Sequence, residues 1–374
     1  MDFHRSRRAV AAALALALLS LTRPAVAHEA EGDGDCYFDN HDSRNGDFDR
    51  DGDVDGCDLG VILTRWGKTG PATEDIDGDR IVGAGDLHLL MERWSPVTHS
   101  GAARPAWATV LDWLLNPAVV TNAAARAAIS ATELPWRVRD TATQIEMLLV
   151  PPGSFMMGCS PSSSYECDSD ESPAHQVSIT RAFYIGRYEV TQAQWSKGGG
   201  GIASNPSQFS GDADSPSRPV ERVSLTRAQW FNSATGMRLP TEAEWEYSYR
   251  SGTTTAYHGS SAMAHGTNDG RMLSSIAWFQ HSAEFRTHAV GHKSANALGI
   301  HDMAGNVWEW CSDWDAEFSA ANQTDPTGPT SGHYRVLRGG GWNDSSYYCR
   351  ASMRYSSAPD YTGYSVGFRV ARNP

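Results

Sequence analysis

The stretch Arg238-Leu-Pro-Thr-Glu-Ala-Glu-Trp-Glu-Tyr247 shows how the larger part of this chain is built. Thr241 is followed three residues later by Glu244, the spacing of a capping box. In this motif each side chain bonds the backbone N–H of the other residue, which satisfies donors that the first turn of a helix leaves free. The stretch therefore predicts a short helix that carries Trp245.

Elements on both sides of this helix are predicted to be short as well. Thr191–Gln194 and Thr226–Gln229 carry similar capping signals, and Gly236 would end the second of these helices. The runs Ile145–Val150 and Phe183–Glu189 are typical of strands, and the first is ended by a Pro-Pro-Gly turn. Long periodic runs are missing from this part of the sequence. The predicted class is therefore α+β with a high loop content.

Residues 28–98 have a different composition, with 18 acidic against 6 basic residues. The difference, −12, accounts for nearly all of the chain's net charge of −13. Such a segment would repel phosphates, so we expect no nucleic-acid partner. A solvated acidic segment is the alternative interpretation, and the regular spacing of the acids argues against it.

The acids form two loops with the spacing of a calcium site. Asp47-Phe-Asp-Arg-Asp-Gly-Asp-Val-Asp-Gly-Cys-Asp58 has carboxylates at positions 1, 3, 5, 7, 9 and 12 and glycine at position 6. A second copy starts at Asp75, and Arg80 and Gly83 at its positions 6 and 9 predict weaker binding. The predicted ligands are Asp47, Asp49, Asp51, Asp53, Asp55 and Asp58, then Asp75, Asp77, Asp79, Ile81 through its carbonyl, and Asp86.

Each loop is followed by an apolar helical stripe, Leu59–Trp66 and Leu87–Trp94. One such face cannot be buried alone, so the two should pack on each other. The loop–helix repeat over residues 47–95 resembles the type I dockerin module, including aspartate at position 12. The resemblance implies calcium-dependent folding, and docking onto a cohesin-like partner or a cell-surface scaffold. A purely structural calcium spacer is the alternative.

The N-terminus has the pattern of a signal peptide. Three arginines between residues 5 and 8 precede the apolar run Ala9–Leu21, and Ala25-Val-Ala27 fits the cleavage site. A transmembrane anchor is the alternative, but about 13 apolar residues are too few to span a bilayer. We therefore expect a secreted, cell-surface or periplasmic protein, cleaved after Ala27, with no membrane span in the mature chain.

The chain is thus expected to have four parts. They are a signal peptide (1–27), a dockerin-like calcium-binding module (28–98), a connecting helix and linker (99–134) and a large domain (135–374). The helix in the third part is predicted from the helical spacing of Trp107, Leu111, Leu114 and Leu115, and an alanine-rich stretch follows it.

Export would place the six cysteines in an oxidising compartment, where disulfides are the default. Six cysteines allow 15 connectivities, which sequence alone does not resolve. Cys159 and Cys167 close a short serine-rich loop and are a candidate local pair. No cysteine pair has the spacing of a zinc site. The sequence has no GxSxG elbow, P-loop or HExxH motif, and no GxGxxG between a strand and a helix. Four histidines, His175, His288, His292 and His301, are interpreted as structural polar residues.

Seven phrases, taken in order, carry a resemblance that covers residues 136–373. They are Pro151-Pro-Gly-Ser-Phe-Met-Met-Gly158, Tyr188-Glu-Val-Thr191, Arg238-Leu-Pro-Thr-Glu-Ala-Glu-Trp-Glu-Tyr247, Asn296-Ala-Leu-Gly299, Asp302-Met-Ala-Gly-Asn-Val-Trp-Glu-Trp310, Arg338-Gly-Gly-Gly-Trp342 and Gly367-Phe-Arg369. Together they resemble the sulfatase-modifying factor, or formylglycine-generating enzyme, family. The resemblance implies an irregular α+β domain related to C-type lectins.

The family's namesakes oxidise a cysteine of a sulfatase to formylglycine, using oxygen and a copper ion held by two cysteines. Thiolates suit Cu(I) because both are soft. The resemblance places Cys349 at the second of these positions, as the candidate catalytic residue, while the first position holds Asp344. A second alignment gives Cys349 a structural role and implies a disulfide with Cys311. Trp308 and Asp344 are candidate pocket residues.

The resemblance also implies a calcium site within the large domain. Its ligands would be the carboxylates of Asp302 and Glu309 and the carbonyls of Gly305 and Val307, all of them hard oxygens. Alternatively, the two carboxylates only cap neighbouring turns.

Two functions from different classes follow. The leading hypothesis is an oxygen-dependent oxidoreductase that modifies a side chain of a partner protein and is tethered by the calcium-dependent module. The alternative is a non-catalytic, lectin-like binding or scaffold protein, because Asp344 stands where the first cysteine is needed. Calcium is the expected cofactor, and copper would be needed only for the namesake reaction. A non-haem iron oxidase is a third possibility, and no His/His/carboxylate triad supports it.

Overall fold

The computed structural model describes residues 65–67, 81–82, 105–113, 115–159, 167–198, 204–259 and 266–374. The chain divides into two units, residues 1–99 and 100–374. In the first unit the amide of Gly67 donates to the carbonyl of Val82 at 2.8 Å, and the side chain of Ile81 is exposed. The predicted signal peptide and all the predicted aspartate ligands of the acidic repeat lie outside the described residues.

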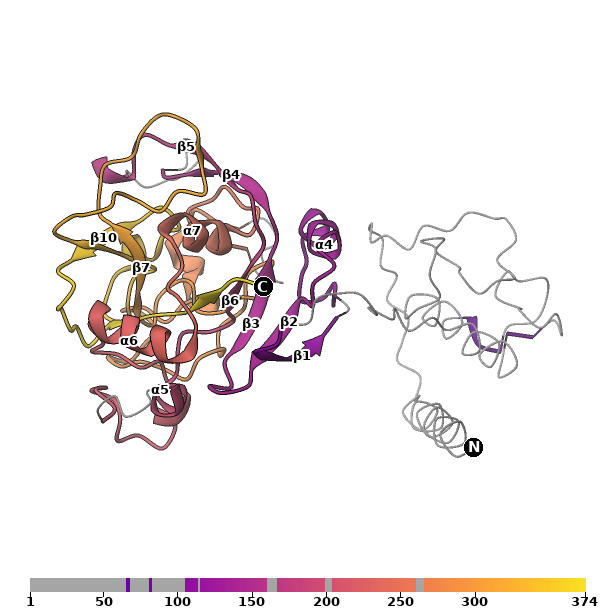
Figure 1. The fold of residues 1–374 in the computed structure, drawn as a ribbon, viewed down its shortest axis with the longest axis horizontal. Helices are drawn as coiled ribbons and strands as arrows, with labels where there is room; N and C mark the ends of the chain where they lie inside the picture. The colour runs from indigo at the N-terminus through magenta and orange to yellow at the C-terminus, as the bar shows by residue number, and fades with distance from the viewer. Residues whose placement is uncertain are drawn as a thin grey trace. The chain divides into compact units, whose positions relative to one another are not determined.

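The second unit contains three sheets, and the largest has the strand order β1-β2-β3-β6-β12. All its pairings are antiparallel. The strands are β1 (Ala108–Asp112), β2 (Arg137–Asp140), β3 (Glu146–Val150), β6 (Phe183–Gly186) and β12 (Ala371–Arg372). Strands β3 and β6 lie where the apolar runs predict strands, although β6 ends before Glu189. Figure 1 shows β1, β2 and β3 side by side, with the C-terminus close to β3.

The second sheet has the order β10-β9-β7-β11 and the third has the order β4-β5-β8. In each, the last strand pairs in parallel with its neighbour and the other pairings are antiparallel. The second sheet consists of β7 (Trp308–Trp314), β9 (Arg335–Arg338), β10 (Arg354–Ser357) and β11 (Val366–Gly367). The third consists of β4 (Gly153–Met157), β5 (His175–Ile179) and β8 (Gln323–Thr324).

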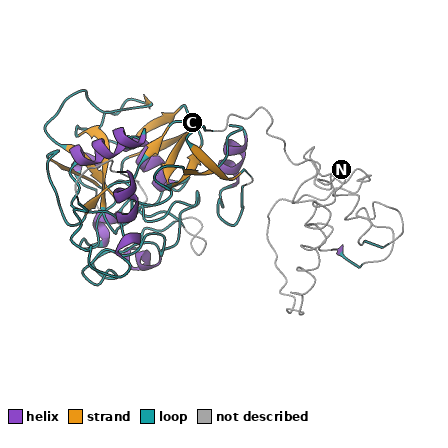
Figure 2. Cartoon of the chain, turned by 60° about the horizontal axis from the view of Figure 1, so that its bottom comes forward, coloured by secondary structure: helices purple, strands orange, loops and turns teal. Residues whose placement is uncertain are grey.

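The helices of the described part are short, and loops make up much of its surface (Figure 2). The α-helices are α4 (Ala123–Ser130), α5 (Gln192–Gly198), α6 (Leu225–Thr235) and α7 (Glu242–Arg250). Four 3₁₀ turns are η1 (Ser169–Glu171), η2 (Ser215–Ser217), η3 (Gly270–Ser275) and η4 (Ser346–Cys349). The predicted class, α+β with high loop content, is confirmed at this level. No helix within the described ranges is long and apolar enough to cross a membrane.

The capping box of α7 is confirmed. Thr241 Oγ1 accepts from the Glu244 amide at 3.1 Å, and Glu244 Oε2 accepts from the Thr241 amide at 2.9 Å. Helix α6 begins earlier than predicted, because Ser224 takes the capping role expected of Thr226 and accepts from the amide of Arg227 at 3.3 Å. Gly236 ends α6 with a positive φ of 69°, as predicted.

The helix predicted around Trp107–Leu115 is wrong. Residues 108–112 instead form strand β1, which pairs with β2 and so joins the large sheet. Trp107 packs edge-on against Tyr184 of β6, with ring centroids 5.6 Å apart. The helical spacing of four apolar residues thus yields to pairing with a strand more than twenty residues away. The helix of this region is α4, which lies in the alanine-rich stretch and is capped by Asn122.

Buried ion pairs cross-link this loop-rich domain. Arg338, Arg350 and Arg369 are completely buried, and Arg354 is nearly so. Each pairs with a buried carboxylate on another element. The pairs are Arg338 with Glu246, Arg350 with Glu171 at 2.6 Å, Arg354 with Glu242 at 2.6 Å and Arg369 with Glu309 at 2.6 Å.

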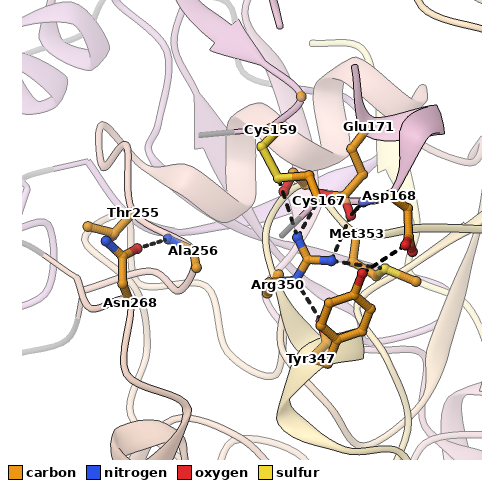
Figure 3. The surroundings of a disulfide bond; sticks show 12 residues. Cys159, Cys167, Asp168, Glu171, Thr255, Ala256, Asn268, Tyr347, Arg350 and Met353 are labelled. Carbon is orange, nitrogen blue, oxygen red and sulfur yellow. Dashed lines mark hydrogen bonds and ion pairs between the residues drawn. A yellow bond between two sulfur atoms is a disulfide. The ribbon is translucent and has the colours of Figure 1, made fainter. Parts of the chain in front are cut away.

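The Arg350–Glu171 pair lies beside a disulfide between Cys159 and Cys167, the local pair that the sequence suggests (Figure 3). Both terminal nitrogens of Arg350 bind Glu171, at 2.7 and 2.6 Å. The guanidinium also lies 4.1 Å above the ring of Tyr347, whose hydroxyl donates to Asp168 at 2.9 Å. These contacts fasten η4 to η1 and to the disulfide.

Replacing Glu171 tests whether such pairs hold the fold. Glu171→Gln keeps the shape of the side chain but leaves the Arg350 charge buried without its counter-charge. We expect the free energy of unfolding to fall by about 3 kcal/mol or more. Urea unfolding at constant pH, followed by circular dichroism, measures the change. Glu133→Gln, at an exposed position, is the matched control and should change stability by less than about 0.5 kcal/mol. An equally stable E171Q protein would contradict the structural role of the pair.

Candidate functional site

The candidate site lies in the connection between β9 and β10. After β9 the chain passes through Gly339 and Gly340, whose φ angles are 98° and 76°. A Cβ on Gly340 would lie 2.9 Å from Cys349 Sγ and from the backbone of Tyr348, so glycine is required by both conformation and space. The chain then turns tightly, and the amide of Asp344 donates to the Gly341 carbonyl at 3.0 Å.

Asp344 closes this turn and contacts β7. Its Oδ2 accepts from the Gly341 amide at 3.0 Å and from Trp308 Nε1 at 2.7 Å. Burial raises the pKa of the Asp344 carboxyl, and the two hydrogen bonds oppose that rise. The structure therefore brings the two candidate pocket residues, Trp308 and Asp344, into direct contact.

Cys349 ends η4 and is completely buried. Its thiol lies 3.8 Å from the carbonyl of Ser345. Burial raises the pKa of the Cys349 thiol, and the nearby charge of Asp344 raises it further. Because the thiolate is the reactive form, a thiol with a raised pKa is a poor nucleophile and a poor metal ligand.

The predicted disulfide between Cys311 and Cys349 is wrong, because both cysteines are free and buried. Cys311 lies on β7, where its thiol is influenced by the charges of Glu242, Asp313 and Arg338. Cys349 faces Gly340 and Asp344 instead. The two thiols therefore have different surroundings.

Four exposed tyrosines surround Trp308 and Asp344. The exposed fractions are 38% for Tyr348, 50% for Tyr355, 45% for Tyr361 and 54% for Tyr364. We call this group, with the buried Trp308 and Trp342 beneath it, the tyrosine surface.

Ring contacts connect the members of the tyrosine surface. The Trp308 ring lies 6.3 Å from Tyr348 and 5.4 Å from Tyr355, and the Trp342 ring lies 5.8 Å from Tyr364. Partial burial raises the pKa of Tyr361, and the neighbouring Tyr355, Tyr364 and Asp344 raise it further, which places all four groups together. None of these tyrosines belongs to a motif that predicts a site. The available signal was the density of tyrosine between residues 347 and 364, which hold five of the thirteen.

The profile described as a sulfatase-modifying factor enzyme 1-like domain matches residues 132–374. The chain belongs to this family. A formylglycine-generating enzyme from Streptomyces coelicolor is 30% identical over 295 residues, which cover 63% of this chain and 91% of that enzyme. Two solved structures share the fold. Treponema denticola variable protein 1 has a TM-score of 0.53 at 29% identity, over 62% of this chain and 95% of that one. PvdO from Pseudomonas aeruginosa has a TM-score of 0.51 at 25% identity, over 64% and 98%.

The copper site implied by the family's namesakes does not fit these residues. Asp344 supplies a hard carboxylate where the first thiolate is needed, and both hydrogen bonds to its Oδ2 come from the protein. Cys349 is a buried thiol whose raised pKa disfavours the thiolate. The pair therefore lacks the two soft ligands that Cu(I) requires.

The implied calcium ligand set does not fit either, because Glu309 is already bound. Arg369 donates to both of its carboxylate oxygens at 2.6 Å, and Trp245 Nε1 donates to Oε2 at 2.7 Å. Glu309 is thus an ion-pair partner in this member of the sulfatase-modifying factor family. The amides of Gly305 and Val307 donate to the Gly339 carbonyl and to Glu189 Oε1. Among the described residues, no group of three or more His, Cys, Asp or Glu side chains could hold a metal ion.

Asp302 lies close to this ion pair and remains buried. Its Oδ2 accepts from the Gly291 amide at 2.6 Å, while its buried Oδ1 has no hydrogen-bond partner. Burial raises the pKa of Asp302 to about 6, and it raises the pKa of Glu189 strongly, with Asp302 and Glu309 adding to the rise. Arg369 is therefore hydrogen-bonded to Glu309 and also interacts electrostatically with the buried carboxyls of Glu189 and Asp302.

Alkylation tests the state of the thiols. In the folded protein, iodoacetamide should leave Cys311 and Cys349 unlabelled, because both are buried. In denaturant without reductant both should react, whereas Cys159 and Cys167 should react only after reduction. Peptide mass mapping identifies the labelled residues. If Cys349 were labelled only after reduction, it would be disulfide-bonded, in contradiction to the free thiol described here.

Proposed function

We propose that this protein is a binding member of the sulfatase-modifying factor family that holds a partner protein on its tyrosine surface. The observation that carries the proposal is the placement of four exposed tyrosines around Asp344. Asp344 itself occupies the position at which the namesakes need a thiol. The site offers a fixed contact surface and lacks a reactive thiol pair.

The composition of the segment supports protein binding. Residues 343–365 contain five tyrosines and six serines among 23 positions. Tyrosine supplies a large amphipathic contact area at low entropy cost, and serine supplies adaptable hydrogen bonds, so both are enriched in binding loops. Tyrosine is also enriched among the residues that dominate binding energy.

The surface is held in place from below. Trp308 is fixed by its hydrogen bond to Asp344, and Trp342 Nε1 donates to the Tyr364 carbonyl at 3.1 Å. Arg350, next to Cys349, is anchored by Glu171 and the disulfide loop. A contact surface that is already ordered loses less entropy when it binds.

The oxidoreductase hypothesis is supported by the similarity to the formylglycine-generating enzyme of Streptomyces coelicolor. The arrangement of Asp344 and Cys349 speaks against it. Copper found in the metal analysis described below, together with oxygen uptake, would support this hypothesis.

A display experiment tests the tyrosine surface. Peptides selected from a random library on the full-length protein should bind it through Tyr355 and Tyr364. The double variant Tyr355→Ala, Tyr364→Ala should weaken their binding by about thirtyfold or more, since one such anchor contributes about 2 kcal/mol. Titration by fluorescence anisotropy measures the change.

Tyr334→Ala is the matched control, since Tyr334 is equally exposed and lies outside the tyrosine surface. The selected peptides should bind this variant as they bind the unchanged protein. Peptides that bind the double variant undiminished would remove the tyrosine surface as the binding site.

We further propose that the two loops of the acidic repeat bind calcium, that folding of this module depends on the bound calcium, and that the protein is exported. The support is the loop spacing from Asp47 to Asp86 and the signal-peptide pattern that precedes it.

Elemental analysis of the mature protein, after dialysis against calcium, should find about two calcium ions per chain and no stoichiometric copper. The combined variant Asp47→Ala, Asp75→Ala should lose the calcium and leave the copper content unchanged. One copper per chain, with oxygen uptake on a Cys-x-Pro-x-Arg peptide, would instead establish the oxidoreductase. Absence of calcium would reject the acidic loops as calcium sites.

A further inference from the structure

A cavity that is separate from the tyrosine surface lies between α7, the end of β7 and the segment that follows β7. The cavity has a volume of about 300 Å³. Its lining includes His175, Glu242, Asp313, Glu317, Phe318 and Arg354. The segment after β7 reaches the β4–β5 hairpin, where β8 pairs with β5 (Figure 1).

This cavity and the tyrosine surface lie on opposite faces of β10. Arg354 and Tyr355 are neighbours on that strand, and successive side chains of a strand point to opposite faces. Arg354 is buried and lines the cavity, whereas Tyr355 is half exposed and contacts Trp308. The cavity therefore plays no part in the proposed contact with a protein partner.

The lining carries more acid than base. Glu242 is neutralised by Arg354, whose Nε and Nη2 donate to its two oxygens at 2.6 and 2.9 Å. Asp313 is 4% exposed and forms no ion pair with another described residue. Glu317 lies exposed at the rim. When Asp313 is ionised, three acids against one arginine leave an excess of two negative charges in the lining.

Asp313 is held so that one oxygen remains available. Its Oδ2 accepts from the Glu242 amide at 3.0 Å and from Ser312 Oγ at 2.9 Å. The other nearby cation, Arg335, stacks 3.6 Å above the Trp314 ring and donates to the Ser312 carbonyl. Oδ1 of Asp313, a residue of the cavity wall, therefore has no hydrogen-bond donor among the residues that the structure describes.

The remaining walls combine acceptors with apolar surface. His175 Nδ1 lies 3.1 Å from the Pro173 carbonyl, which can only accept, so Nδ1 carries a proton. In the tautomer with its one proton on Nδ1, Nε2 is an acceptor. The Phe318 ring stands edge-on to His175 at 4.9 Å. A ligand for this cavity needs N–H donors at one end and an apolar stem.

We propose that the cavity binds an organic cation of side-chain size, an alkylammonium or guanidinium group on an apolar stem, with Asp313 as its counter-ion. The volume suits a ligand of that size, at the small end of known ligand sites. An inorganic metal ion is disfavoured, since the described residues offer no set of three or more ligating side chains.

The proposal predicts a pH dependence of binding. Burial, together with the charge of Glu242, raises the pKa of Asp313 to about 7. Below that pH the carboxyl is protonated and lacks the charge that attracts a cation. Above it the ionised form binds, until the amine itself loses its proton near pH 10. The affinity should therefore rise between pH 6 and pH 8.5. The charged groups close to Asp313 are Glu242, Glu244 and Arg335. The same cavity is also lined by three further titratable or charged side chains, His175, Glu317 and Arg354.

Isothermal titration of the full-length protein tests this site. The probes are n-butylamine, N-acetyl-lysine methylamide and N-acetyl-arginine methylamide, and the neutral control is N-acetyl-norleucine methylamide. At least one cation should bind at pH 8.5, and the neutral compound should bind at least tenfold more weakly. Binding of n-butylamine alone would identify a free amine as the ligand, and binding of the capped residues would identify a protein side chain.

Asp313→Asn keeps an oxygen for the Glu242 amide and removes the charge, so it should weaken cation binding by about thirtyfold. Glu317→Gln, at the rim, should weaken it by less than about threefold, because exposed pairs contribute little. The unchanged protein should bind at least tenfold more tightly at pH 8.5 than at pH 6, which gives a reading that does not depend on the variant's folding. Equal binding of the neutral compound, no binding of any cation, or binding unaffected by pH would overturn the proposal.

Discussion

The domain depends on arginine–carboxylate pairs buried inside it. Its helices are short and its strands are few residues long, so hydrogen-bonded elements alone connect little of the chain. Arg338, Arg350, Arg354 and Arg369 join segments that lie 60 to 179 residues apart in the sequence. A buried pair is neutral or unfavourable compared with a well-packed apolar pair, but a single unpaired charge is strongly destabilising. The stability of the fold therefore depends on each of these buried arginines keeping its carboxylate partner.

The same pairs position the two proposed binding regions. Arg350 anchors the turn that ends in Cys349, next to the tyrosine surface, and Arg354 lines the cavity on the other face of β10. In both places a carboxylate is left over once the arginines are paired. In both aspartates, Oδ2 accepts two hydrogen bonds from the protein. The two carboxylates differ in their surroundings, because Asp344 lies among exposed tyrosines whereas Asp313 lines a cavity. This difference in surroundings is why we assign a contact surface to the first region and a cation site to the second.

Local signals in the sequence predicted local structure well. The capping box at Thr241 and the Cys159–Cys167 disulfide involve residues at most eight apart, and both are present in the structure. Failures occurred where partners are distant. Strand β1 forms because of its pairing with β2, and Glu309 binds Arg369 instead of joining an oxygen-only ligand set. The phrases that identify the family did indicate the position of Asp344. The grouping of the tyrosines around it depends on how η4 and β10 pack against Trp308 of β7, which local sequence does not determine.

Asp344 both removes a soft copper ligand and supports the tyrosine surface. A carboxylate in place of a thiol removes a soft ligand, which argues against copper chemistry. The same carboxylate is half buried and needs donors, because a buried charge without hydrogen bonds is costly. Trp308 and the Gly341 amide meet that need, and the fixed Trp308 ring in turn supports Tyr348 and Tyr355. The residue that breaks the thiol pair is thus also the residue that supports the contact surface, so the proposed binding role and the argument against copper chemistry rest on the same position.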